Sequence, residues 1–193
     1  TILVGQAMGK HDIPHAKRVL GSSATFFVAA SLSIAILGYV LTPSILQWMG
    51  TPAAAQAQAQ AYLHVIFLAL PTMFMFSFVS AVLRGAGDTT TPFWFLLIVV
   101  VLDSVLNPVF IFGWLGAPVL GIRGAAWATL VANVLSFVAL LVWLRWRNHP
   151  LWIHTQEWAL FKPDWLIVRA LVIKGLPMGA QMVMLSIAMI VMM

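Results

Sequence analysis

The chain has 193 residues, of which 62% are hydrophobic and only 8% are charged. A soluble domain carries about 25% charged residues, so this composition excludes an ordinary water-soluble globule and predicts a protein embedded in a lipid bilayer. The formal net charge of +5 is therefore no sign of a nucleic-acid partner, because in a membrane protein the basic residues mark one side of the bilayer.

Four apolar stretches are each long enough to cross a bilayer, since a membrane helix needs about 20 mostly apolar residues. They cover residues 25–46, 62–83, 93–114 and 125–144. Residues 145–174 mix charge, tryptophan and proline, and residues 164–174 suit a short amphipathic helix in the membrane interface. A further apolar stretch, 176–193, begins another span.

The predicted fold class is an all-α, polytopic helical bundle. Since the chain starts without a methionine and stops in an apolar stretch, we expect it to be part of a longer protein.

The basic residues are distributed asymmetrically between the loops. Alternating the spans across the membrane leaves Arg123 alone on one side, and the other nine basic residues lie on the opposite side: Lys10, Lys17, Arg18, Arg84, Arg145, Arg147, Lys162, Arg169 and Lys174. The positive-inside rule predicts that the side with nine basic residues is cytoplasmic.

Asp103 is the candidate ion-coupling residue, because the other four acidic residues fall in predicted loops and it alone lies near the middle of a span. An ionised carboxylate at mid-bilayer costs at least about 2.5 kcal/mol, so it should face a cavity or a partner. Asn107 follows one turn later on the same helix face, and Pro108 then frees a backbone carbonyl. We expect Asp103, with Asn107, to exchange a proton or to help coordinate a cation. The alternative is a structural residue that is hydrogen-bonded to Asn133 or Ser136.

Weaker candidates line the expected cavity. Thr129 and Asn133 form a polar stripe on the next span, for which packing is an equally good explanation. Met73 and Met75 can adapt to varied ligands, and the alternative for them is ordinary packing or contact with lipid. The chain has no cysteine, zinc helix, phosphate loop or nucleophile elbow. We therefore expect no enzyme activity, metal site or cofactor, and transport that draws its energy from an ion gradient or from another chain.

Three strings in the sequence resemble one family. LRGAGDTTTP at residues 83–92 is similar to the loop between helices 4 and 5 of multidrug and toxin extrusion (MATE) transporters. VLNPVFIFG at 105–113 resembles the family's helix 5, and GIRGAAWAT at 121–129 resembles the start of its helix 6. Many prokaryotic members carry Asn and, one turn later, Asp before Pro, whereas this chain has Asp103 first and then Asn107. The exchange shifts the carboxylate by about 5 Å along the helix axis.

The resemblance implies the amino-terminal lobe of a two-lobe, twelve-helix transporter. Residues 1–144 correspond to the end of helix 2 and helices 3 to 6, residues 145–174 to a cytoplasmic inter-lobe linker, and residues 175–193 to the start of helix 7 in a second lobe. Such a protein is a multi-pass component of the bacterial inner (plasma) membrane.

The implied function is secondary active antiport, in which drug-like, often cationic organic compounds leave in exchange for Na⁺ or H⁺. The implied partners are a small-molecule substrate, the lipid bilayer and the second lobe. One alternative is a lipid-linked oligosaccharide flippase of the same superfamily, which needs a markedly cationic cavity. The other is a structural membrane subunit that does not transport, for which Asp103 is dispensable.

Overall fold

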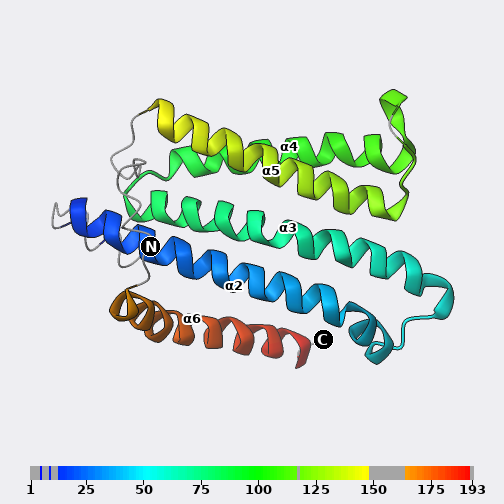
Figure 1. Ribbon diagram of the computed structural model, residues 1–193, viewed down its shortest axis with the longest axis horizontal. Helices are drawn as coiled ribbons and strands as arrows, with labels where there is room; N and C mark the ends of the chain where they lie inside the picture. The colour runs from blue at the N-terminus through cyan, green and yellow to red at the C-terminus, as the bar shows by residue number, and fades with distance from the viewer. Residues whose placement is uncertain (1–4, 6–8, 10–12, 117, 148–163, 192–193) are drawn as a thin grey trace.

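The computed structural model describes residues 5, 9, 13–116, 118–147 and 164–191 (Figure 1). Within these ranges the chain is helical and contains no β-strand. The elements are α2 (Ile13–Trp48), α3 (Ala53–Gly85), α4 (Thr90–Phe112), the short 3₁₀ helix η1 (Trp114–Gly116), α5 (Ile122–Trp146) and α6 (Trp165–Val191). Helices α2 to α5 are long and apolar enough to cross a membrane, so the all-α class and the four complete spans are confirmed.

The helices lie side by side with nearly parallel axes (Figure 1). Helix α5 packs along both α3 and α4, α2 packs along α3, and α6 touches α2, whereas α3 and α4 make little contact with each other. Because successive helices reverse direction, the starts of α2, α4 and α6 meet the ends of α3 and α5 at one end of the bundle (Figure 1). The sparse contact between α3 and α4 leaves room for a cavity above α5.

The two ends of the helix bundle differ in charge. The end where α3 finishes and α4 starts carries Lys17, Arg18, Arg84, Arg145 and Arg169. Arg123, in the first turn of α5, lies at the opposite end. Within the described residues, the charge asymmetry expected from the sequence is therefore present in the fold.

Small residues bring α5 close to its neighbours. Ala126, Ala128 and Ala132 are completely buried. At Gly124 a side chain would collide with the backbone carbonyl of Phe110 on α4, so only glycine permits this approach. Close backbone approach through small residues is how helices pack in membranes, where apolar burial alone gives no preference for another helix over lipid.

Large apolar side chains face outward over much of the bundle. Val40 is 66% exposed, Ile36 62% and Val142 60%, which suits side chains in contact with lipid rather than water. Pro43, Pro71 and Pro108 lie inside α2, α3 and α4, a placement that membrane helices tolerate.

The carboxyl-terminal part differs from the sequence expectation. Residues 164–174 and 176–193 are expected as an interfacial helix followed by a separate span, but α6 is one continuous helix from Trp165 to Val191. Its first turn is fixed to α2, because Arg18 forms an ion pair of 2.9 Å with Asp164 and the Asp164 backbone N–H donates to the Ser22 hydroxyl at 3.3 Å. Most of the expected linker, residues 148–163, lies outside the described residues.

Candidate functional site

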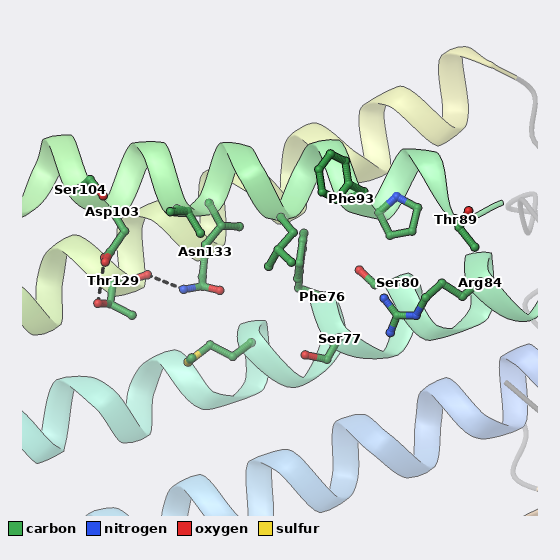
Figure 2. A pocket seen from close by; sticks show the side chains of 15 residues that line it. Phe76, Ser77, Ser80, Arg84, Thr89, Phe93, Asp103, Ser104, Thr129 and Asn133 are labelled. Atoms are coloured by element: carbon green, nitrogen blue, oxygen red, sulfur yellow. Dashed lines mark hydrogen bonds between the residues drawn. The ribbon is translucent and has the colours of Figure 1, made fainter.

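A cavity of about 740 Å³ lies between α3 and α4, with α5 as its floor (Figure 2). Fifteen residues line it: Met73, Phe76, Ser77, Ser80, Arg84, Thr89, Pro92, Phe93, Leu96, Val99, Val100, Asp103, Ser104, Thr129 and Asn133. A volume of this size suits a drug-sized ligand. Among these residues Asp103 is the single acid and Arg84 the single base, and the two lie toward opposite ends of the cavity (Figure 2).

The Asp103 carboxylate is held by two neighbouring side chains. The Thr129 hydroxyl on α5 donates to Oδ1 at 2.9 Å. The Asn107 amide donates to Oδ2 at 3.1 Å and to the Asp103 backbone carbonyl at 2.9 Å. Hydrogen bonds to a carboxylate are about twice as strong as neutral ones. The half-buried Asp103 therefore has a fixed position on the wall of the cavity.

These contacts differ from the structural alternative. Asn133 lines the cavity, but its amide donates to the Thr129 backbone carbonyl at 2.8 Å rather than to Asp103. Ser136 is fully buried, and its hydroxyl has no hydrogen-bond partner in the described structure. The residues expected as structural partners of Asp103 thus do not bind it, and Thr129 and Asn107 do.

The end of the cavity that contains Asp103, called the acidic end, offers oxygen atoms to a small cation. The Asp103 carboxylate, the Thr129 hydroxyl and the Ser104 hydroxyl come from two helices. Pro108 lacks an N–H, so the Ser104 backbone carbonyl has no helical donor four residues later. Among the described residues there is no group of three His, Asp or Glu side chains able to hold a metal ion. The arrangement is therefore a candidate site for a small cation or for the positive group of a ligand.

Hydroxyl groups and one guanidinium mark the other end of the cavity. Ser80 and Arg84 lie one turn apart on α3, and Thr89 precedes α4 (Figure 2). The turn between the helices depends on Gly87, with φ +93°, and on Asp88, whose carboxylate accepts a hydrogen bond from the Thr91 N–H at 2.9 Å. The MATE-like string at 83–92 is thus a helix end, a left-handed glycine and a cap for the next helix.

The middle of the cavity is mainly apolar, although Ser77 and Asn133 also line it (Figure 2). Met73 and Phe76 on α3 lie across from Leu96 and Val99 on α4. Met75, proposed from the sequence beside Met73, is outside this lining. An apolar middle between two charged ends fits an amphipathic ligand.

Sequence reasoning missed Ser80 and Arg84 as site residues. Arg84 was placed in a loop after the second span, but it belongs to the last turn of α3. Its spacing of four from Ser80 puts both on one helix face, and this spacing was the available signal. Ser80 alone gave none, since isolated serines are common in membrane helices.

The fold and the cavity define a class, that of multi-pass helical membrane proteins with a charged internal site. The chain belongs to the MatE family, whose family model matches residues 1–109. It is 35% identical over 188 residues to the probable multidrug resistance protein YoeA of Bacillus subtilis, a match that covers 97% of this chain and 41% of that protein. It is 29% identical to YpnP of the same organism, with coverages of 95% and 39%. The chain thus spans about two fifths of the length of these curated relatives.

Solved structures show the same fold. An outward-facing multidrug resistance MATE transporter of the MOP superfamily aligns with a TM-score of 0.85 and 26% identity, and the match covers 97% of this chain and 40% of that one. A MATE structure in the straight conformation gives a TM-score of 0.84 at 25% identity, with the same coverage. The predicted fold, one lobe of a MATE-type transporter, is confirmed.

Proposed function

We propose that this chain forms the substrate- and ion-binding lobe of a secondary active antiporter of the bacterial inner membrane. The antiporter exports drug-like, often cationic organic compounds in exchange for Na⁺ or H⁺, without enzymatic chemistry or a cofactor. Asp103 is the ion-coupling carboxylate and Asn107 its partner, while Thr129, Asn133 and Met73 line the substrate cavity. Because the chain spans about two fifths of its relatives, this activity is proposed for the complete transporter.

The carboxylate of Asp103 on the wall of a drug-sized cavity carries this proposal. A carboxylate is costly within a membrane span, and such residues usually mark ion or substrate pathways. Here the carboxylate reaches the cavity and is oriented by Thr129 and Asn107. The relatives YoeA and YpnP, both described as probable multidrug resistance proteins, support export of varied compounds.

The coupling follows from competition for one carboxylate. A proton or Na⁺ that binds Asp103 neutralises it and weakens the attraction for an organic cation, whereas the free carboxylate attracts the cation. Alternating access, in which this lobe rocks against the remainder of the transporter, then exposes the same site to each side in turn. Loading with the ion outside and with the drug inside produces antiport.

The charges of the cavity bear on the competing functions. A flippase for lipid-linked oligosaccharides needs a markedly cationic cavity, but this lining contains Arg84 as its single base, balanced by Asp103. A structural subunit could use Asp103 for its hydrogen bond to Thr129, but it does not need the carboxylate to line a cavity. The antiporter therefore remains the function that the lining favours.

The test is dye efflux from drug-sensitive cells that express the complete gene carrying this sequence. Asp103→Asn keeps the size of the side chain and removes its charge, and it should reduce efflux of a cationic dye at least tenfold at equal expression. Asp164→Asn is the matched control, because it removes an acid outside the cavity, and it should retain efflux. Unchanged efflux in Asp103→Asn would contradict the coupling role.

A further inference from the structure

The cavity has a second polar end, which coupling at Asp103 does not use. Ser80 is 4% exposed, and its hydroxyl lines the cavity without a hydrogen-bond partner in the described structure. Arg84, one turn further along α3, lines the same end, and no ion pair of its guanidinium occurs among the described residues. Figure 2 shows both side chains at the end of the cavity away from Asp103.

An unpartnered hydroxyl at this burial is unusual. Buried polar groups in folded proteins are nearly always hydrogen-bonded, and each exception calls for an explanation. Ser136 is also unpartnered, but it lies outside the cavity lining. Ser80 differs because it belongs to the cavity lining, and because the guanidinium-bearing Arg84 lies one turn away on the same helix.

The acid nearest to Arg84 in the sequence is Asp88. The carboxylate of Asp88 is outside the cavity lining, and its Oδ1 accepts a hydrogen bond from the Thr91 N–H. The Thr89 hydroxyl adds a further donor at the mouth of the cavity, since it makes no capping hydrogen bond to α4. The Arg84 guanidinium and the hydroxyls of Ser80 and Thr89 can therefore all donate hydrogen bonds to oxygen atoms of a ligand.

We propose that Arg84 and Ser80 form an oxyanion subsite, which binds the carboxylate, phosphate or sulfonate group of a compound in the cavity. A guanidinium is suited to this chemistry because its planar donors match two oxygen atoms of such a group. The inference rests on the proposed function and extends its substrate class. The cavity takes zwitterionic amphipathic compounds, with the anionic group at Arg84 and the cationic group toward Asp103.

The dimensions of the cavity set the shape of these compounds. Ten residues separate Phe93, at the Arg84 end, from Asp103 along α4, which corresponds to about 15 Å of helix. The long arginine side chain shortens the span that a ligand must bridge. The lining between the ends includes Phe76, Leu96 and Val99, so the body of the compound should be apolar.

The experiment compares two dyes that differ in one group. Rhodamine B carries a cationic ring system and a free carboxylate, while its ethyl ester carries the same cation without the anion. Binding of each is measured by fluorescence anisotropy to the complete protein in dodecyl maltoside, whose headgroup is uncharged. Wild type should bind the acid more tightly than the ester, by about tenfold, as expected for one charge-assisted hydrogen-bond pair.

Three variants test the origin of this preference. Arg84→Gln and Ser80→Ala should bring the ratio of the two dissociation constants close to one. Arg123→Gln removes the same charge from the exposed start of α5, outside the cavity, and should keep the wild-type ratio. Ser80→Ala removes a hydroxyl that has no protein partner, so its thermal stability should not fall, and loss of preference in a stable variant supports the subsite.

The outcomes separate this inference from the proposed function. Binding of the ester by wild type without preference for the acid, or a preference that survives in Arg84→Gln, would overturn the oxyanion subsite alone. Failure of wild type to bind either dye would overturn both. The oxyanion could come from a lipid headgroup or from the transported compound, and short-chain phosphatidylglycerol distinguishes the two. If this lipid displaces rhodamine B from wild type but not from Arg84→Gln, the subsite binds a lipid phosphate. If it displaces no dye, the subsite binds the anionic group of the transported compound.

Discussion

The two ends of the cavity differ in how their polar groups are satisfied. At the acidic end, Thr129 and Asn107 both donate to the carboxylate of Asp103. At the other end, the Ser80 hydroxyl has no partner in the described structure, and Arg84 has no ion pair there. The acidic end is organised before a ligand arrives, whereas the Arg84 end has hydrogen-bonding capacity left for a ligand.

This difference suggests that the two ends of the cavity have different functions. A group that binds a small ion gains from neighbours that fix its geometry, because a small cation is sensitive to the positions of its oxygen ligands. A group that binds varied organic compounds gains from donors that are not committed to one geometry. The fixed end suits coupling, and the open end suits recognition.

The acidic end depends on close contact between α4 and α5, so the largest effect is expected at Gly124. Gly124→Leu places a side chain against the Phe110 carbonyl, and it should lower the free energy of unfolding by about 3 kcal/mol. Thermal unfolding in detergent, followed by fluorescence-detected size exclusion, measures this. Gly175→Ala is the control, because nothing lies within 4 Å of a side chain added there. Equal stability of the two variants would refute the dependence.

Removal of one partner of the carboxylate should have a smaller effect. Thr129→Val keeps the shape of the side chain and deletes the 2.9 Å hydrogen bond to Asp103, and efflux should fall about tenfold, as expected for a charged hydrogen bond. Thr129→Ser restores the hydroxyl and should recover most of the rate. Identical efflux in the valine and serine variants would show that the contact has no role.

At the Arg84 end of the cavity, removal of a hydroxyl should not lower the free energy of unfolding, unlike removal of the Thr129 hydroxyl at the acidic end. Ser80→Ala removes a buried hydroxyl without a partner, so the free energy of unfolding should stay constant or rise by up to about 1 kcal/mol. Thr129→Val, measured in the same way, should lower it. A loss of stability in Ser80→Ala as large as that in Thr129→Val would remove the contrast between the two ends.

The ion pair between Arg18 and Asp164, which lies outside the cavity, should contribute least to the stability of the fold. Arg18 is 62% exposed and Asp164 24% exposed, and exposed pairs stabilise by about 0.2–1 kcal/mol. Arg18→Gln should therefore change the melting temperature only slightly, and the change should disappear at high salt. A large, salt-independent loss would show that the contact between α2 and α6 is a main support of the fold.

The sequence predicted the spans better than their ends. Apolar length alone located four membrane helices, because a bilayer imposes a fixed minimum length. It did not predict that α6 continues through Gly175 and Pro177, since both residues ordinarily interrupt a helix in water. Membrane helices tolerate both residues within a span.

The candidate site was predicted in part. Asp103 stood out because a carboxylate within a span is costly, and the pairing with Asn107 followed from helical spacing. The bond from Thr129 to Asp103 joins two helices, and one sequence does not contain their rotation or depth. For the same reason Ser80 and Arg84 became site residues only when α3 was seen to face α4 across a cavity.

Gradient-driven transport in proteoliposomes tests the coupling role of Asp103 most directly. The complete protein, as wild type and as Asp103→Asn, is reconstituted with an imposed Na⁺ or pH gradient, and uptake of a cationic dye is compared with dye-for-dye exchange without a gradient. If Asp103 couples transport to the ion gradient, Asp103→Asn should abolish accumulation of the dye against its gradient while measurable exchange remains. Gradient-driven accumulation at the wild-type rate in Asp103→Asn would contradict this coupling role.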